Sequence, residues 1–465
     1  MLFVALNSAG FAQGGAAPQL PSDAEIRQIL ATRIDGEKQS VGIVVGIVSP
    51  QGRRVIAYGS VTQGDPRPLD GDTVFEIGSM TKVFTSLVLM DMVQHHEVSL
   101  DDPVTKYLPS SVHVPDRGGR QITLRDLSTQ TSGLPRMPDN FHPKDPGNPY
   151  ADYSADQLYQ FLSGYTLTRD IGEKFEYSNV GVGLLSHALS RRAGTDYETM
   201  VTTRILKPLG MTDTGVTLSA DQKARLAPGH DALLKTVKNW DLSVLAGAGA
   251  LRSTANDILT FLAANLELKE TPLTSAMAAE VSPRRATGTA NLEIAYAWFV
   301  MSRHGKTIFW HNGGTGGYRT FMGYDPKAQL GIVVLSNTST PSGVDDIGYH
   351  LLDLEQPLAK LAPPKEHKEI SLDPKTLEAF VGQYQLAPKF IVTISLNNGH
   401  LYAQASGQQQ FEIFPEGPRV FFAKLVEITI DFEVGPQGEA TALVLHQNGR
   451  DTTAKRIESS ADQNQ

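Results

Sequence analysis

The sequence FEIGSMTK at residues 75–82, followed by VFTSLVLMDMV at 83–93, determines how the rest of the chain is interpreted. Residues 83–93 are apolar on nearly every side, which predicts a helix buried at the centre of a domain. Ser79 and Lys82 are three residues apart, so on a helix they share one face. A serine hydroxyl needs an adjacent base to become a nucleophile, and a buried lysine can lose its proton near neutral pH. The pair predicts an activated serine, although a serine N-cap followed by a lysine gives the same string.

Strand-like segments occur on both sides of this helix. Residues 41–48 (VGIVVGIV) and 54–59 (RVIAYG) are separated by the turn signal SPQG, which predicts a hairpin. Four short strands are expected near the end of the same domain, at 296–300, 308–311, 320–324 and 331–336, with turn-rich connections at 311–319 and 325–329. Early and late strands around a helical middle predict an α+β domain with one antiparallel sheet flanked by helices.

The pattern of apolar and polar residues changes after this domain, which we place at 21–356. Residues 357–370 contain Pro and Lys without periodicity and are expected to form a linker. Evenly spaced alternating segments then predict a small all-β barrel at 371–458, before a disordered tail at 459–465. The expected strands are 392–396, 401–405, 420–423, 427–432 and 442–445.

Composition excludes several classes of function. The 465 residues carry 41 Lys+Arg and 50 Asp+Glu, a net charge of −9, which excludes a basic nucleic-acid-binding protein. The chain has 0 Cys, so disulfides, thiolate zinc sites and cysteine nucleophiles are absent. The histidines lack H-E-x-x-H spacing, and we predict no metal and no cofactor. No apolar run approaches the roughly 20 residues of a membrane span, and the oligomeric state stays open.

The first residues resemble a targeting segment. Residues 1–12 (MLFVALNSAGFA) are apolar, and Gly10 and Ala12 are small residues at −3 and −1 of a possible cleavage site. A basic n-region is missing, so an ordinary unstructured terminus is the alternative. We predict export to the periplasm or the medium and leave residues 1–20 out of the fold.

Two further motifs carry polar groups suited to catalysis. In Tyr177-Ser178-Asn179, a tyrosine close to a lysine can move protons, and an asparagine can hold a substrate amide. A turn before a helix at 183–191 explains the same residues without function. The segment HNGGTGGYR at 311–319 follows an apolar run, and its glycines let a substrate approach the backbone of a strand closely. It lacks the G-x-x-x-x-G-K-[ST] pattern of a phosphate-binding loop.

Taken in order, Ser-x-x-Lys, Tyr-x-Asn and His-x-Gly resemble the serine β-lactamase and penicillin-binding-protein superfamily. The resemblance is to its class C-like branch, which includes class C β-lactamases, DD-carboxypeptidases, D-aminopeptidases and related esterases. It covers residues 40–336 and is supported by FEIGS at 75–79, ITLRDL at 122–127, TSGLP at 131–135, ILKPLGM at 205–211 and GAGAL at 247–251. It implies a β-lactamase/transpeptidase-like fold with an all-helical subdomain. Residues 371–458 resemble the lipocalin-like barrel of some members.

The resemblance also implies a role for each site residue. Ser79 is the acylated nucleophile, Lys82 and Tyr177 share the proton handling, and Asn179 holds the substrate amide. Which of Lys82 and Tyr177 is the resting base stays open. The N–H groups of Ser79 and Gly314 form an oxyanion hole, on the strand that also carries His311 and Gly313 next to the substrate.

One departure from the family pattern bears on the substrate. His311 stands where class C β-lactamases have the lysine of Lys-Thr-Gly, and a histidine with a pKa near 6.5 is mostly neutral at pH 7. This weakens the case for β-lactams and D-Ala-D-Ala peptides, whose carboxylate needs a cation. Arg319 is a candidate to replace that charge, and a loop-bracing arginine is the alternative. If His311 touches substrate, kcat/KM should bend near its pKa.

The sequence therefore predicts a serine hydrolase that acts through an acyl-enzyme on a small-molecule or peptide substrate. A peptidase or amidase on D-amino-acid peptides and an esterase are favoured, and a class C-like β-lactamase comes third. A non-catalytic penicillin-binding-like sensor is the alternative from another class. A zinc hydrolase is disfavoured because the histidines lack ligand spacing.

Overall fold

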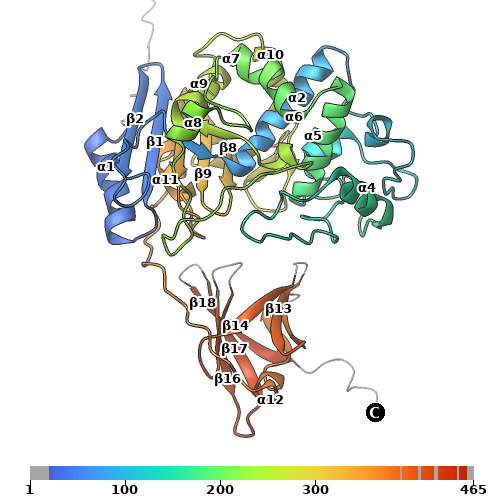
Figure 1. Ribbon diagram of the computed structural model, residues 1–465, viewed down its shortest axis with the longest axis vertical. Helices are drawn as coiled ribbons and strands as arrows, with labels where there is room; N and C mark the ends of the chain where they lie inside the picture. Colours follow the sequence, from blue (N-terminus) through green and yellow to red (C-terminus); the bar gives the residue numbers. More distant parts are fainter. Residues whose placement is uncertain (1–19, 388–389, 407–409, 424–427, 448–449, 458–465) are drawn as a thin grey trace, which may run out of the picture. The chain divides into compact units, whose positions relative to one another are not determined.

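The computed structural model describes residues 20–387, 390–406, 410–423, 428–447 and 450–457. The chain divides into two compact units, Met1–Lys360 and Leu361–Gln465 (Figure 1). The signal-like segment, except for residue 20, and the predicted disordered tail at 459–465 lie outside the described residues. No helix in the described part of the chain has the length and apolar character needed to cross a membrane.

The first unit is built on an eight-stranded antiparallel sheet. Its strands, in spatial order, are β2 (Gly52–Gly59), β1 (Gly42–Ser49), β10 (Leu330–Ser336), β9 (Arg319–Asp325), β8 (Lys306–Gly314), β7 (Phe299–Arg303), β6 (Leu292–Ile294) and β5 (Arg285–Ala286). The early hairpin joins the late strands through β1 and β10, where Val45 lies opposite Val334. A separate two-stranded sheet pairs β3 (Val74–Glu76) with β4 (Arg252–Thr254). The predicted α+β class is confirmed.

Both faces of the large sheet are covered by helices. Because side chains alternate across a strand, Val45 and Ile47 of β1 face α1 (Asp23–Ala31) and α11 (Asp345–Leu352). Val44 and Val48 face the other way, into the core that contains α9 (Ala255–Asn265) and α2 (Thr81–Gln94). The backbone of Gly46 passes close to Leu259 of α9. The sheet is thus the middle layer of the unit.

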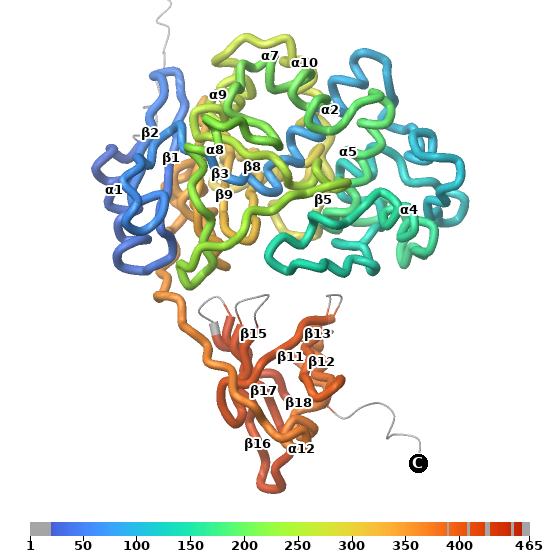
Figure 2. The backbone as a smooth tube through the Cα atoms, in the orientation of Figure 1, coloured from blue at the N-terminus to red at the C-terminus, as the bar shows by residue number. Residues whose placement is uncertain are grey.

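Helix α2 lies inside the unit, as its apolar sequence predicted, and Figure 2 shows it surrounded by other elements. Twelve of its residues, Thr81 to Met92, are buried, and it begins two residues before the predicted start at 83. Between β3 and β4 the chain forms helices and turns without an extended strand, which confirms the all-helical subdomain. The helices of this stretch besides α2 are η2 (Gly78–Met80), η3 (Val104–Tyr107), α3 (Leu124–Ser128), α4 (Ala155–Gly164), α5 (Asn179–Ala193), α6 (Tyr197–Val201), η4 (Thr202–Leu206), α7 (Lys207–Leu209), α8 (Ala220–Arg225) and η5 (Ala246–Ala248), and the unit also contains η1 (Thr32–Gly36) and α10 (Thr274–Glu280).

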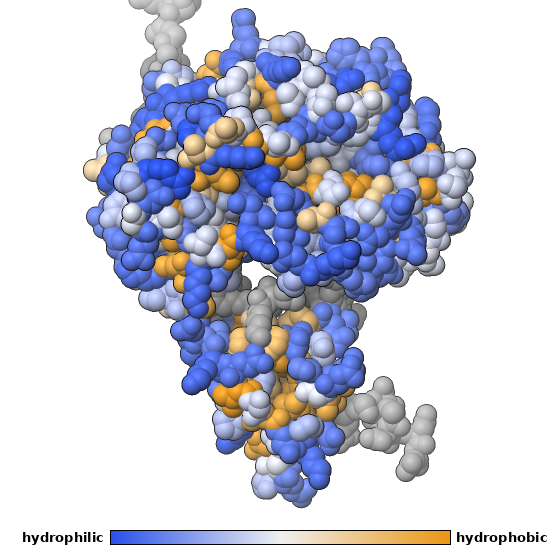
Figure 3. All heavy atoms as spheres, in the orientation of Figure 1, coloured by the Kyte–Doolittle hydropathy of each residue, from blue (hydrophilic) through white to orange (hydrophobic). Residues whose placement is uncertain are grey.

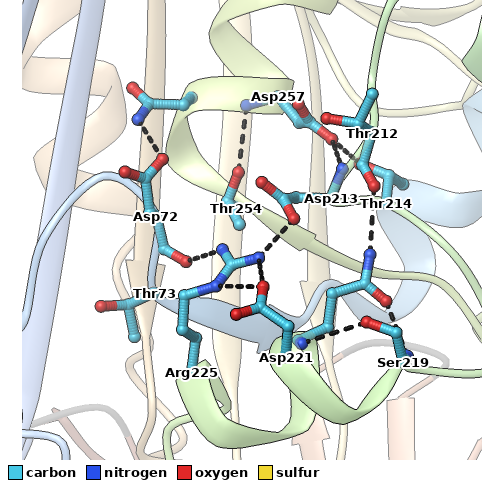
Figure 4. Close-up of polar contacts among 12 residues, drawn as sticks. Asp72, Thr73, Thr212, Asp213, Thr214, Ser219, Asp221, Arg225, Thr254 and Asp257 are labelled. Carbon is cyan, nitrogen blue, oxygen red and sulfur yellow. Dashed lines mark hydrogen bonds and ion pairs between the residues drawn. The ribbon is translucent and has the colours of Figure 1, made fainter.

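A polar network holds the small sheet in place (Figure 4). The Arg225 guanidinium of α8 donates to the Asp72 carbonyl oxygen over 2.7 Å and also binds the Asp213 carboxylate. Asp257 accepts from the Asp213 backbone N–H over 2.8 Å, and its own N–H donates to the Thr254 hydroxyl at the start of α9. These contacts connect α8 and α9 to the segment before β3, the strand that leads into Ser79.

One predicted late strand and one predicted connection need correction. The segment predicted as a strand at 296–300 becomes β7 only at Phe299, because Tyr296 donates its N–H to the Glu280 carbonyl and Ala297 has a φ of +63°. The connection predicted as a turn from 311 is still strand as far as Gly314, which pairs with Arg319. Glycine-rich sequence was read as a loop, whereas these glycines let β8 approach a neighbouring segment.

The second unit is a closed eight-stranded barrel, which confirms the predicted all-β domain. Its strands are β11 (Gly382–Ala387), β12 (Phe390–Asn397), β13 (His400–Ala405), β14 (Phe411–Pro415), β15 (Val420–Ala423), β16 (Thr429–Val434), β17 (Ala440–Gln447) and β18 (Arg450–Ile457), preceded by α12 (Pro374–Glu378). The sequence missed β11, β14 and β18. Phe380, Phe421 and Phe432 pack against one another in a core of the unit's own residues.

The face of the molecule seen in Figure 3 mixes hydrophilic side chains with scattered apolar ones. Among the described residues, four large apolar side chains from separate segments are exposed: Val55, Leu233, Leu354 and Phe390. Single apolar residues of this kind are ordinary on protein surfaces.

Candidate active site

Ser79 stands where β3 turns into the central helix. It lies in η2, which continues directly into α2, and its side chain is partly exposed. Gly78 before it has a φ of +50°, and a Cβ there would lie 2.7 Å from the Gly314 nitrogen. The turn therefore requires glycine both for its conformation and for the close approach of β8.

Lys82 lies one turn further on, beside the Ser79 hydroxyl. Its Nζ is 3.0 Å from Ser79 Oγ and donates to the Ala248 carbonyl oxygen over 2.6 Å. The side chain is 0% exposed, and burial lowers its pKa well below 10.5, with the charge of Arg136 adding to the effect. A buried amine that has lost its proton is a base in contact with the hydroxyl that it must activate.

Tyr177 completes a group of three side chains. Lys82 Nζ lies 4.9 Å from the centre of the Tyr177 ring. Burial raises the pKa of Tyr177 to about 12, while its hydrogen bond with Ser79 and the charge of Arg136 oppose the rise. The phenol is therefore protonated at neutral pH and can donate. The structure brings together the three residues that the sequence named as nucleophile and proton carriers.

Asn179 presents an unused acceptor to the same place. It is the first residue of α5, whose N-terminus is capped by the Ser178 hydroxyl. The Asn179 N–H donates to the Arg136 carbonyl over 2.9 Å, and its Nδ2 contacts the Met137 sulfur at 3.6 Å. Within the described part of the chain, the buried Oδ1 has no hydrogen-bond partner. A buried acceptor without a partner is costly, and a substrate N–H would satisfy it.

Gly313 and Gly314 bring β8 against the segment that leads into Ser79. A Cβ on Gly313 would lie 2.0 Å from the Ile77 carbonyl oxygen, so a larger residue would push the strand away. Thr320 of β9 donates its hydroxyl to the same oxygen over 3.0 Å. Gly314 lines the cavity together with Ser79. The oxyanion hole formed by the Ser79 and Gly314 N–H groups stays a prediction.

His311 is buried beside Tyr177 and does not line the cavity. It is 1% exposed, its ring centre lies 6.4 Å from that of Tyr177, and its Nδ1 is 2.6 Å from the Asn312 oxygen. Burial, followed by the charge of Lys82, lowers its pKa to about 3. The sequence treated this histidine as an ordinary one with a pKa near 6.5. Its expected bend in kcat/KM therefore moves well below the neutral range.

Arg319 has the contacts of one of the two alternatives that the sequence left open. It pairs with Gly314 across the strands, and pleat alternation places it on the sheet face of Phe321, opposite the face that carries His311. Its guanidinium donates to the Thr315 and Tyr318 carbonyl oxygens, both over 3.1 Å. These are the contacts of a loop-bracing arginine, so we do not carry the proposed substrate carboxylate contact further.

A small cavity opens at Ser79, with an empty volume of about 280 Å³. Two aromatic residues at this cavity, Tyr150 and Trp240, were not predicted, because both lie in segments without a recognisable motif. The cavity is lined by Gly78, Ser79, Tyr150, Asn179, Trp240, Leu242, Ala248, Gly249, Gly314 and Thr315.

One group of potential metal ligands occurs elsewhere in the described part of the chain, formed by His304, Asp353 and Glu355. His304 Nδ1 lies 2.6 Å from Asp353 Oδ2, and Lys306 Nζ lies 3.2 Å from the other carboxylate oxygen. A lysine ammonium in contact with the carboxylate competes with a metal cation, so we assign no metal to this group.

Comparison with known proteins identifies relatives of both units. Residues 23–356 match the family model described as Beta-lactamase, and 366–458 match a domain of unknown function, DUF3471. Penicillin-binding protein 4* of Bacillus subtilis (strain 168) is 26% identical over 86% of this chain and 91% of its own length. The D-alanyl-D-alanine-carboxypeptidase/endopeptidase AmpH of Escherichia coli (strain K12) is 27% identical over 77% and 94%.

Solved structures agree with this relationship. A β-lactamase/D-alanine carboxypeptidase from Yersinia pestis, complexed with citrate, superposes with a TM-score of 0.63 and 25% identity, covering 73% of this chain and 99% of that one. A class C β-lactamase from Rhodobacter sphaeroides, at 24% identity and a TM-score of 0.61, shares the fold over 72% and 98%. With a family model matched over residues 23–356 and the Ser79 site inside that range, this chain belongs to the β-lactamase family of serine hydrolases.

Proposed function

We propose that the enzyme cleaves amide or ester bonds through an acyl-enzyme formed on Ser79, with Lys82 as the resting base. The observation that carries the proposal is the 3.0 Å contact between Lys82 Nζ and Ser79 Oγ, with Tyr177 beside both. The opposite pKa shifts support the division of roles. A depressed lysine pKa leaves an amine ready to accept a proton, and a raised tyrosine pKa leaves a phenol ready to donate one.

The reaction follows from these positions. The Ser79 hydroxyl proton passes to the Lys82 amine while Oγ forms a bond to the substrate carbonyl carbon. The N–H groups of Ser79 and Gly314 would hold the resulting oxyanion. Tyr177 then protonates the leaving nitrogen or oxygen as the scissile bond breaks, and Lys82 returns a proton to the phenolate. In the second half a water molecule gives up a proton to this pair and attacks the acyl ester, which releases the acid and regenerates Ser79.

Peptides that contain D-amino acids are the substrate class that we favour, with small acyl esters next. The names of the two relatives above, a D-alanyl-D-alanine carboxypeptidase and a penicillin-binding protein, support this choice. The free Asn179 acceptor suits an amide N–H in the acyl part. β-Lactams come third because a neutral His311 supplies no charge for their carboxylate, and the same argument places D-Ala-D-Ala peptides below other peptides that contain D-amino acids. Export remains a proposal that agrees with this substrate class.

A labelling experiment tests the proposal. We expect a fluorophosphonate probe to attach to the protein at Ser79, as located by peptide mass spectrometry, and a panel of p-nitrophenyl esters, D-amino-acid anilides, D-Ala-D-Ala peptides and a chromogenic cephalosporin to include a turned-over substrate. Ser79→Ala should abolish labelling and lower kcat by at least about 10⁴-fold. Ser302→Ala, at an exposed position on β7, is the matched control and should keep both.

Two results would contradict the proposal. Labelling that persists in Ser79→Ala would place the nucleophile elsewhere. Stoichiometric labelling by a fluorescent penicillin, with no substrate of the panel turned over by the wild-type protein, would favour the sensor alternative, because such a protein captures a ligand without releasing it.

A further inference from the structure

Arg136 is a cation at the edge of the active site. Its side chain is exposed, and its guanidinium carbon lies 5.1 Å from the centre of the Tyr177 ring. Its backbone carbonyl accepts the N–H of Asn179, which fixes this residue at the N-terminus of α5. Among the described residues it forms no ion pair. A guanidinium held beside the reacting groups without a carboxylate partner is open to an anion from outside.

The other cationic side chains near the site do not offer the same charge. Burial lowers the pKa values of Lys82 and of His311, which disfavours the positive charge on both side chains. Arg319 lies on the opposite face of the sheet and donates to backbone carbonyls. The charge of Arg136, by contrast, adds to the lowering of the Lys82 pKa and opposes the rise that burial causes in the pKa values of Tyr177 and Tyr150, so its field reaches the cavity.

Two polar groups at this end of the site are suited to bind the same ligand. Among the residues that the structure describes, the buried Asn179 Oδ1 has no hydrogen-bond donor and the exposed Arg136 guanidinium has no acceptor. The two residues are joined by the 2.9 Å hydrogen bond between the Asn179 N–H and the Arg136 carbonyl. A ligand with an amide N–H and a nearby carboxylate satisfies both, and an arginine can bind a carboxylate through two N–H donors.

We propose that Arg136 is a specificity-determining residue that binds a carboxylate on the substrate, in the position next to the amide held by Asn179. The preferred substrates are then acidic, and an anionic acyl or leaving group is selected over its neutral isostere. This inference rests on the proposed hydrolase function and adds the charge class of its substrate.

Matched pairs of esters test the charge preference. p-Nitrophenyl butyrate and mono-p-nitrophenyl glutarate differ by a carboxylate in the acyl chain, and phenyl acetate and 3-carboxyphenyl acetate differ by one in the leaving group. For the wild type, we expect a higher kcat/KM for the anionic member of at least one pair. Arg136→Gln should lower that preference by about 10- to 100-fold, mainly through KM, since a hydrogen-bonded charge contributes of that order. Arg136→Lys should restore part of it.

Two controls test whether the effect is specific to Arg136 and whether the hydrolase itself is intact. Arg303→Gln removes an exposed arginine at the far end of the β7–β8 hairpin and should leave both pairs unchanged. Fluorophosphonate labelling of Ser79 in every variant shows that the hydrolase itself is intact, and its absence in the wild type would instead contradict the proposed function. An equal fall in both members of each pair, or no charge preference in the wild type, would overturn the role of Arg136 as a carboxylate ligand.

Discussion

At the scale of single residues, the site depends on how burial acts on groups of opposite charge type. Desolvation disfavours every charged form, so it lowers the pKa of the Lys82 amine and raises that of the Tyr177 phenol. The same process therefore favours the neutral amine that acts as a base and keeps the phenol that acts as an acid protonated, both beside one hydroxyl. Hydrogen bonding to Ser79 and the charge of Arg136 reduce the rise in the pKa of Tyr177. An isolated motif gives the residue types, and the fold supplies their protonation states.

His311 provides a test of this argument through stability. Its pKa falls from 6.5 to about 3 on folding, because the buried imidazole resists protonation. A group with a depressed folded pKa contributes its full stability above the unfolded pKa and loses it as the pH falls. The wild type should therefore lose roughly 3–5 kcal/mol of unfolding free energy from this group between pH 6.5 and 3. His311→Gln, which does not titrate, should lack this loss, as measured by urea denaturation at several pH values.

The activity profile provides an independent check on the same residue. Since the imidazole stays neutral from pH 5 to 8, kcat/KM of His311→Gln should have the same shape as that of the wild type across this range, whatever its absolute value. An ionisation near pH 6.5 that disappears in the variant would contradict the buried, neutral histidine. A constant difference in unfolding free energy at every pH would do so as well.

At the scale of elements, two loops from different parts of the chain meet over Ser79. The Tyr150 and Trp240 rings lie 5.3 Å apart, and both line the cavity. Asn148 and Asp241 join the loops through two hydrogen bonds of 2.9 and 2.7 Å. The Glu76 carboxylate accepts the backbone N–H of Trp240 over 2.9 Å, so the strand that leads to Ser79 also holds the backbone that carries this ring. The rings limit the space available to a substrate.

This arrangement predicts a change in size selectivity. Trp240→Ala removes a wall of the cavity, and we expect kcat/KM for p-nitrophenyl octanoate relative to p-nitrophenyl acetate to rise by about tenfold or more. Asn148→Ala loosens the connection between the loops but keeps both rings, so it should change the ratio less. A ratio unchanged in a folded Trp240→Ala protein would mean that the ring does not limit the substrate.

Elements with strong periodicity were predictable, whereas those shaped by distant contacts were not. The apolar run after Lys82 and the β-branched residues of β1 led to the correct helix and hairpin because local sequence determines both. Trp240 could not be placed, since its position depends on Glu76, distant in the chain. β18 was missed because RDTTAKRI has little apolar alternation, and only the pairing with β11 and β17 makes it a strand. The sequence left two roles open for Arg319 because its face of the sheet depends on the register with Gly314.

At the scale of the whole molecule, the two units have separate cores. The barrel packs around Phe380, Phe421 and Phe432, and Tyr384 donates its hydroxyl proton to the Phe380 carbonyl over 2.7 Å. The hydrolase unit packs around α2 and the two faces of its own sheet. Every residue that we place in the catalytic site precedes Lys360, where the first unit ends. A closed barrel has no free sheet edge, so it can fold without borrowing strands.

A chain that ends at Lys360 should therefore keep its chemistry. We expect it to fold cooperatively, to be labelled at Ser79 by a fluorophosphonate, and to hydrolyse p-nitrophenyl acetate with a kcat within about threefold of the full chain, because each unit has a hydrophobic core of its own. Calorimetry of the full chain should show one transition that the shortened chain retains. If the shortened chain folds, as judged by that transition, yet loses labelling, the barrel contributes to the catalytic site itself. If the transition disappears, the hydrolase unit depends on the barrel for its stability, and the independence argued from the separate cores is wrong.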